Sequence, residues 1–302
     1  LSSYEGNLCG FELVVGEKEL QFNQLVNTQQ STKPIRSIVQ FQQFLFISNA
    51  TQVEKFNLLT KKLMNVIDVN DRVDQLQIVN NFLLAVHNDQ ITLYDIPCTQ
   101  LLTYKLKSKV MQCISYNETS FLVLTKNHLT AFCLNKTQMI SQLQLEDDYF
   151  QIQKVDDENV CLLGEKKITK LNLKTNQKVT FEGIGFNAML FDQGKFFVGL
   201  QNGQLIILNQ EMQKLKKYQL EGRIKKIIEL EDKTYCVVCS DKVEIVGFDQ
   251  ELLEIGRKEF SIRLIDAIKW RDLEEIIEQP EEMEEVEEFE EFEEFEEIDE
   301  KE

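Results

Sequence analysis

The chain alternates short apolar runs with polar turns along most of its length. In residues 82–96, apolar runs from Phe82 to Val86 and from Ile91 to Ile96 flank the polar stretch His87-Asn88-Asp89-Gln90. Two such runs joined by a short polar turn predict a β-hairpin. Related hairpins are predicted at 45–58, 121–134, 160–173, 196–209 and 235–248.

Each predicted hairpin has two further strands beside it. A third strand follows the hairpin, as at 101–106 and 214–220, and a fourth precedes it. The preceding strands are 35–41, 73–79, 110–116, 150–156, 186–192 and 224–230, and their starts are 36 to 40 residues apart. Four strands in about 40 residues is the period of a propeller blade, so the pattern predicts six complete blades.

The two ends of the chain predict a seventh blade. Residues 264–270 match an innermost strand with no hairpin after it, whereas residues 1–13 match a hairpin with no inner strand before it. Residues 20–26 can form the outer strand. Sharing one blade between the termini pairs the open edges of the ring. The expected fold is therefore all-β: a seven-bladed propeller closed by a shared blade.

Charge divides the chain into two parts. The net charge is −18, but residues 271–302 hold 19 acidic and 2 basic residues, a net charge of −17. Residues 1–270 hold 32 acidic and 31 basic residues, a net charge of −1. We therefore expect a nearly neutral propeller over 1–270 and an acidic Glu/Phe-rich tail over 271–302.

The tail repeats Glu-Glu-apolar six times over residues 281–298. A period of three fits neither a helix nor a strand, and dense like charge adds repulsion, so we expect disorder, with a helix-compatible stretch only at 270–279. Phe289, Phe292 and Phe295 are candidate anchors for a basic partner such as a ribosomal protein or a histone. Two alternatives are a tail that only adds solubility and a tail that folds over basic groups of its own propeller.

Basic residues gather where outer strands lead into the next inner strand. These connections are expected on one rim of the ring, and we call their basic residues the basic rim: Arg36, Arg72, Lys109, Arg223, Lys225 and Arg263. A local positive field would suit an anionic partner, either rRNA phosphate or an acidic protein segment. Ordinary solvated charge is the alternative.

Residue patterns for catalysis or metal binding are missing from the sequence. The residues around 182–186 lack the lysine and spacing of a phosphate-binding loop, and no G-x-S-x-G nucleophile elbow occurs. His87 and His128 are predicted in a surface turn and at a strand start, without metal-ligand spacing. The pairs at 147–148 and 156–157 are expected to be solvated turn acids. We therefore predict no enzyme activity, cofactor, metal or small-molecule substrate.

The seven cysteines are odd in number and mostly lie inside apolar runs, so we predict reduced core thiols in an intracellular protein. Cys236 and Cys239 have redox or zinc spacing, but residues three apart on a strand point to opposite faces. No apolar run approaches the roughly 20 residues of a membrane span, and no signal peptide is identified.

The repeats resemble degenerate WD40 repeats, with Tyr94-Asp95 in place of the usual Trp-Asp. Residues 2–13, "SSYEGNLCGFEL", are similar to the opening hairpin of the maintenance-of-killer or PAK-interacting-protein family of WD40 ribosome biogenesis factors. Residues 263–270 are similar to the segment that closes that propeller, and residues 221–227 to the turn entering its sixth blade. The resemblance implies a non-catalytic scaffold in the nucleus and nucleolus, bound to basic ribosomal or assembly proteins of the large-subunit precursor, with possible contact to the rRNA backbone.

Two other functions are compatible with the same pattern. Propellers are general binding platforms, so the chain could be an adaptor in a signalling, trafficking or ciliary complex. The acidic tail alone would also suit a histone-type chaperone.

Overall fold

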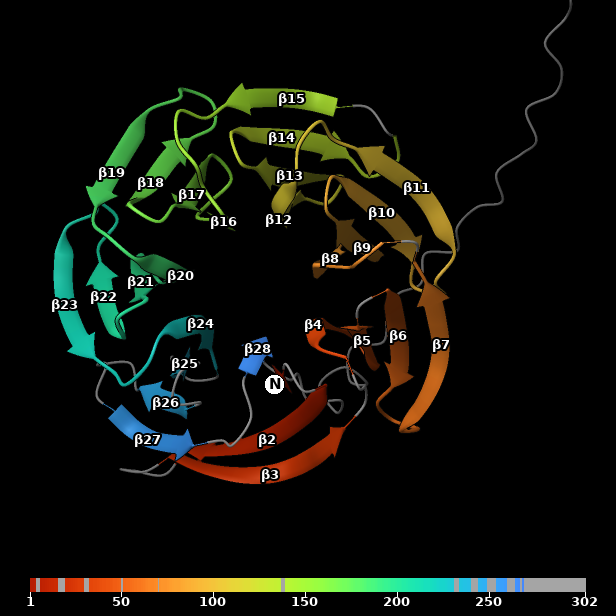
Figure 1. Cartoon of the computed structure of the whole chain (residues 1–302). Helices are drawn as coiled ribbons and strands as arrows, with labels where there is room; N and C mark the ends of the chain where they lie inside the picture. Colours follow the sequence, from red (N-terminus) through yellow and green to blue (C-terminus); the bar gives the residue numbers. More distant parts are fainter. Residues whose placement is uncertain are drawn as a thin grey trace, which may run out of the picture.

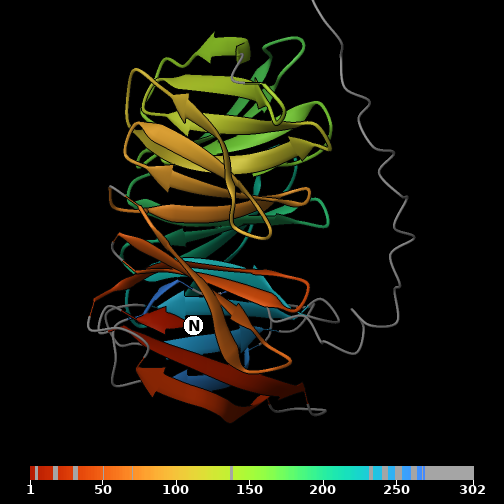
Figure 2. The same ribbon diagram turned by 90° about the vertical axis from the view of Figure 1, so that its right-hand side faces the viewer.

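Seven four-stranded antiparallel sheets surround a central axis in the computed structural model (Figure 1). The structure describes residues 1–3, 6–15, 20–29, 33–49, 51–69, 71–136, 139–230, 234–239, 244–248, 254–259, 264–266 and 268. Seen from the side, the ring is a disc (Figure 2). All regular structure in these residues is β-strand, and they include no helix of the length and apolarity needed to cross a membrane.

The six internal blades each use four consecutive strands, ordered from the axis outwards. Blade 1 contains β4 (Ile35–Phe41), β5 (Phe44–Asn49), β6 (Gln52–Asn57) and β7 (Lys62–Asp68). Blade 2 contains β8 (Gln75–Val79), β9 (Phe82–His87), β10 (Gln90–Asp95) and β11 (Gln100–Lys105). Blade 3 contains β12 (Val110–Asn117), β13 (Ser120–Thr125), β14 (His128–Cys133) and β15 (Met139–Gln144).

The second half of the ring repeats this order. Blade 4 contains β16 (Gln151–Lys154), β17 (Asn159–Leu163), β18 (Lys167–Asn172) and β19 (Lys178–Glu182). Blade 5 contains β20 (Phe186–Asp192), β21 (Lys195–Leu200), β22 (Gln204–Leu208) and β23 (Lys214–Gln219). Blade 6 contains β24 (Ile224–Glu229), β25 (Tyr235–Cys239), β26 (Glu244–Phe248) and β27 (Glu254–Glu259).

The termini share blade 7, as the two half-patterns of the sequence predict. Its inner strand β28 (Leu264–Asp266) pairs with β1 (Ser2–Ser3), and β2 (Asn7–Val15) and β3 (Leu20–Gln29) follow outwards. The register places Ser2 opposite Asp266 and Ser3 opposite Leu264. The ring is thus closed by backbone hydrogen bonds between the two ends of the chain.

Tight turns need few glycines because Asn and Gln adopt the left-handed backbone conformation. Asn80, Asn88 and Gln193 have φ angles of 54°, 39° and 45°. Two-residue hairpin turns require this conformation, and Asn tolerates it better than most residues. One consequence corrects the sequence prediction: the turn in blade 2 is only Asn88-Asp89, so His87 lies inside β9 and pairs with Gln90.

The hydrophobic core lies in the seams between neighbouring blades. Tyr104 of blade 2, for example, meets Phe121 and Phe132 of blade 3 with ring centroids 5.2 and 5.3 Å apart. A separate apolar cluster fills the seam between blades 7 and 1 and each of the seams between consecutive blades from 1 to 6. Burying one such side chain contributes about 1.5–3 kcal/mol. Blades 1 to 5 are therefore each packed against both of their neighbours through apolar side chains.

Side-chain amides add a repeated polar clasp to these seams. Gln151 on β16 donates from Nε2 to the carbonyl of Met189 (2.8 Å) and accepts from the Met189 N–H (2.9 Å). Gln75 makes the same pair of bonds to Cys113, and Gln112 accepts from Ile152 N–H. The amide imitates a strand backbone, so it extends the hydrogen bonding of one inner strand to the next.

Candidate functional site

The connections from each outer strand to the next inner strand lie on one face of the disc. Leu106 N–H donates to Asp89 O (2.8 Å) and Gly185 N–H to Glu165 O (2.9 Å), which joins outer-to-inner connections to the turns between second and third strands. We call this side of the disc the rim face. Loops on one face of a rigid ring are the usual place for binding residues.

The basic rim occupies one arc of the rim face. Arg223 and Lys225 enter blade 6, Arg36 enters blade 1, Arg72 enters blade 2 and Lys109 enters blade 3. Lys109, Lys225 and Arg72 are exposed, whereas Arg36 and Arg223 are half-buried. Arg263 precedes β28 of blade 7 but lies outside the described residues. The connections into blades 4 and 5 end in Tyr149-Phe150 and Gly185, so among the described residues the arc covers the entries to blades 6, 1, 2 and 3.

Acidic residues fill the part of the rim face that enters blade 4. Glu146, Asp147 and Asp148 form that connection, and each pairs with a lysine: Lys178 (2.9 Å), Lys167 and Lys126 (3.1 Å), respectively. Asp147 and Asp148 were predicted as solvated turn acids; they do lie in a connection between strands, but both are ion-paired with lysines. The rim face is therefore polarised, with a basic arc beside an ion-paired arc.

A shallow cavity of about 280 Å³ opens on the rim face at blade 2 and is lined by Asp71, Arg72, Asp74 and Asn88. Arg72 Nε lies 2.7 Å from Asp74 Oδ1. This hydrogen bond and the Asp74 charge raise the pKa of the guanidinium. Arg72 is thus paired with a carboxylate of its own chain, whereas Lys109 is exposed at the entry to blade 3.

His87 lies near this cavity and is only 2% exposed, which contradicts the predicted surface turn. Neither ring nitrogen has a hydrogen-bond partner within the described residues. Burial lowers the pKa of the ring, and the nearby Asp71 backbone and the Asp71 and Asp74 charges offset this only in part. His87 is therefore a neutral buried group. His128 opens β14, as predicted, and is half-buried.

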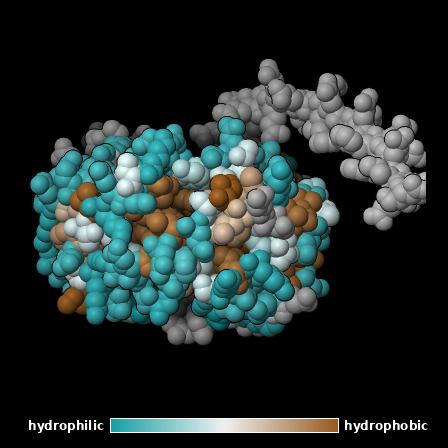
Figure 3. Space-filling view, turned by 90° about the horizontal axis from the view of Figure 1, so that it is seen from above, coloured by the Kyte–Doolittle hydropathy of each residue, from teal (hydrophilic) through white to brown (hydrophobic). Residues whose placement is uncertain are grey.

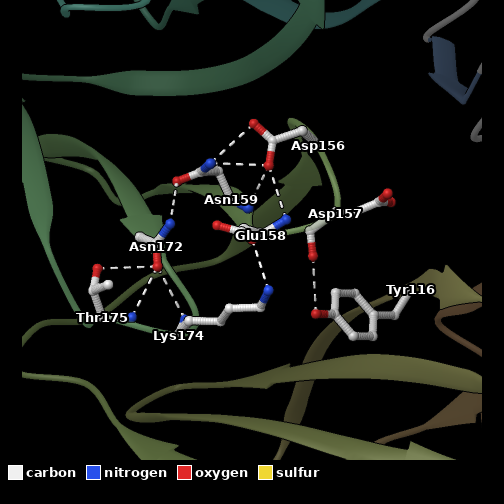
Figure 4. Close-up of polar contacts among 8 residues, drawn as sticks. All are labelled: Tyr116, Asp156, Asp157, Glu158, Asn159, Asn172, Lys174 and Thr175. Carbon is white, nitrogen blue, oxygen red and sulfur yellow. Dashed lines mark hydrogen bonds and ion pairs between the residues drawn. The ribbon is translucent and has the colours of Figure 1, made fainter.

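The opposite face carries a polar turn network at blade 4 (Figure 4). Asp156 accepts the N–H groups of Glu158 and Asn159, both at 2.8 Å, and the Asn159 side-chain amide at 2.9 Å. Burial would raise the pKa of Asp156, but these donors together lower it. The Tyr116 hydroxyl donates to Asp157 O (3.1 Å). Asp156 and Asp157 are exposed in the turn between β16 and β17, which confirms the prediction of solvated turn acids for this pair.

The cysteines have free thiols, and five of the seven are buried. Cys98 and Cys133 are only half-buried, so the prediction of core thiols is wrong for these two, which lie in a turn and at a strand end. Cys236 and Cys239 are both buried on β25, and burial raises the pKa of Cys236 to about 12. Among the described residues, no group of His, Cys, Asp or Glu has the geometry to hold a metal ion.

The circumference of the disc exposes apolar residues at intervals. Figure 3 shows the side on which β15 lies, where apolar surface gathers between polar regions. Met139 and Ile140 of β15 are exposed there, and each of the outer strands of blades 1 to 5 has at least one exposed apolar residue. The phenylalanines of the tail, Phe289, Phe292 and Phe295, lie outside the described residues.

Comparison with known proteins identifies the fold. No family model and no curated protein matches the chain. Among solved structures, it is similar to the WD40 β-propeller domain of Doa1, with a TM-score of 0.65, 12% identity, and coverage of 78% of this chain and 84% of that one. The computationally designed Ika8 protein gives a TM-score of 0.61 at 12% identity, covering 81% of this chain and 79% of that one. The chain therefore has a WD40-type propeller fold.

Proposed function

We propose that the chain is a non-catalytic WD40-type scaffold in assembly of the large ribosomal subunit, located in the nucleolus. Its propeller binds ribosomal or assembly proteins of the precursor particle, and the basic arc of the rim face contacts rRNA phosphate. The acidic tail binds a basic protein of the same particle. A propeller provides a rigid ring with many loops, which suits binding to several partners at once.

The observation that carries this proposal is the composition of blade 7. The two segments that resemble the ribosome biogenesis family, at 2–13 and 263–270, contribute neighbouring strands to one sheet, with Ser2 opposite Asp266 and Ser3 opposite Leu264. Two resemblances from opposite ends of a sequence thus fall on a single structural unit. The polarised charge of the rim face gives further support, because a positive arc attracts nucleic-acid phosphate.

The test is sedimentation of the tagged full chain through a sucrose gradient, followed by identification of what co-purifies. We expect the chain in fractions of the large-subunit precursor, together with basic ribosomal proteins. The double variant Lys109→Glu/Lys225→Glu should leave those fractions, whereas Lys136→Glu, an exposed lysine beside the β14–β15 turn on the opposite face, should not.

Other outcomes would redirect the proposal. Absence from precursor fractions would contradict it. Recovery of a kinase, coat or ciliary complex would instead favour an adaptor, and preferential recovery of histones would favour a chaperone.

A further inference from the structure

The outer strand of blade 1 exposes more large apolar residues than the outer strands of blades 2 to 5. Leu63, Met64 and Val66 of β7 are 51%, 56% and 39% exposed, and Leu59 in the preceding turn is 50% exposed. The corresponding strands β11, β19 and β23 each expose one apolar residue, and β15 exposes two. Concentrated exposed apolar surface marks an interaction site. We define the blade-1 edge patch as Leu59, Lys61, Lys62, Leu63, Met64 and Val66.

β7 is also the edge of its sheet, because within the described residues it pairs only with β6. Figure 2 shows the side of the disc to which β7 (orange) belongs. Natural proteins usually protect such edges with charge or by covering them, since an open apolar edge invites association. Charged lysines at the start of β7 protect part of its edge from association, but the apolar residues that follow them are exposed to solvent.

The patch is positively charged. Lys61 and Lys62 are exposed between Leu59 and Leu63, and neither forms an ion pair with a described residue. At the far end of the strand, Asp68 accepts a hydrogen bond from Gln52 at 2.8 Å. A complementary occupant must therefore combine apolar side chains with negative charge.

The tail of the same chain has this combination. Residues 281–298 repeat Glu-Glu-apolar, with Met283, Val286, Phe289, Phe292, Phe295 and Ile298 at the apolar positions. Aromatic rings at this spacing can cover aliphatic side chains while the neighbouring carboxylates reach lysine. The charge and the hydrophobicity of the two segments are matched.

The last described residue before the tail also lies near the patch. Ile268, the last described residue, packs against the cluster of Ile35, Ile38, Leu45 and Ile47, to which Leu58 also belongs. Leu58 directly precedes Leu59 of the patch. Only 12 residues lie between Ile268 and Glu281, so the chain between them can reach at most about 45 Å. A short tether of this kind gives an effective concentration in the millimolar range, so weak contacts suffice.

We propose that the acidic tail docks on the blade-1 edge patch of its own propeller, with its phenylalanines on Leu59, Leu63, Met64 and Val66 and its glutamates at Lys61 and Lys62. Docking covers the open edge of β7. It also holds the tail until a more basic partner displaces it, so the patch regulates the tail. This inference does not depend on the identity of that partner.

A zero-length carbodiimide cross-linker tests the contact in the full chain, because it joins only lysine amines and carboxylates that touch. We expect Lys61 and Lys62 to link to glutamates within 281–297, within one molecule. A mixture of ¹⁵N-labelled and unlabelled chains identifies links between copies. Links mainly between copies, or from the tail to Lys109 and Lys225 of the basic rim, would overturn the proposal.

Two variants separate docking from chance proximity. Met64→Ser should lower the yield of the Lys61 and Lys62 links about fivefold, because it removes an apolar contact. Leu215→Ser is the matched control, since Leu215 is 51% exposed at the corresponding bulge of β23. Equal yields in the two variants would contradict the proposal. In the triple variant Phe289→Ser/Phe292→Ser/Phe295→Ser, hydrogen exchange at residues 59–66 should become faster because the tail no longer covers them, whereas exchange at β23 should stay the same. Unchanged exchange at residues 59–66 would also overturn the proposal.

Discussion

Blades 3 and 4 hold most of the ion pairs of the described ring, whereas blade 2 buries a histidine and blade 1 exposes an apolar outer strand. Five of the six ion pairs among described residues involve blades 3 and 4 or their connection, and one lies in blade 2. The buried Tyr149 hydroxyl and Thr169 Oγ1 share a hydrogen bond of 2.8 Å. In contrast, the ring of His87 in blade 2 has no hydrogen-bond partner among the described residues, and β7 of blade 1 exposes Leu63, Met64 and Val66.

The contrast separates charge that stabilises the ring from surface that is available for binding. Exposed ion pairs add little stability, and their charges are already neutralised for a partner. Exposed lysines beside exposed apolar side chains, as at Lys61 and Lys62, offer both positive charge and hydrophobic area to a partner or to the tail. The two regions have the same fold and strand order, so the difference arises from side chains alone.

The largest effect is expected at the seam where blade 4 meets blade 5. Gln151→Leu removes both hydrogen bonds to Met189 and leaves its N–H and carbonyl unpaired, which should cost about 2–3 kcal/mol in free energy of unfolding. In blade 1, Ser37 Oγ accepts the Leu76 N–H (3.1 Å), so Ser37→Ala should cost about 1 kcal/mol. Urea denaturation of the full chain measures both. Equal losses would mean that the amide clasp adds nothing beyond one bond.

The buried histidine should make the stability of blade 2 depend on pH. Because burial lowers the pKa of His87, the unfolded chain takes up a proton near pH 6.5 while the folded chain does not. Stability is therefore complete above about pH 6.5 and falls as the pH drops towards the folded pKa, by at most about 1.4 kcal/mol per pH unit. His87→Leu should remove this slope between pH 6.5 and 5.5, and His128→Gln should retain it. A slope unchanged in His87→Leu would assign it to other groups.

Asp156 gives a smaller effect with its own pH window. Asp156→Ala removes the acceptor for two backbone N–H groups, which should cost about 1 kcal/mol at pH 7 after allowance for solvent exposure. Since the pKa of Asp156 is lowered in the folded chain, this contribution is present above the unfolded pKa of about 3.9 and is lost as the pH falls below it. Denaturation at pH 7 and pH 3 measures the difference. Asp157→Ala, which loses one contact to Lys154, should change less.

The period of apolar runs was enough to predict the seven blades and their closure, because strand alternation and turn spacing are local properties of a sequence. The position of His87 was not predictable in this way. Its burial depends on whether Asn88 adopts the left-handed conformation and shortens the turn to two residues. The run of four polar residues at 87–90 does not indicate whether the turn has two residues or four.

The seam and the rim face were also only partly predictable. Gln75, Gln112 and Gln151 recur in the sequence at about the period of the blades, but a polar residue on a strand does not by itself indicate a bond to the next blade. The basic arc followed from counting residues before inner strands. Its ion-paired neighbour did not, because Lys126, Lys167 and Lys178 come from other turns and strands and meet their acids only in the folded ring.

The smallest effects should come from exposed groups in both regions, and they sharpen the distinction between them. Lys126→Gln removes an ion pair whose two side chains are each 68% exposed, so the free energy of unfolding should change by about 0.5 kcal/mol or less. Met64→Gln should also change it by about 0.5 kcal/mol or less, because more than half of that side chain faces solvent. Denaturation at 0.5 M salt, where screening shortens the reach of charge, isolates the packing contribution. A loss above about 1 kcal/mol for Met64→Gln under these conditions would place Met64 in the fold itself and remove it from the surface available for binding.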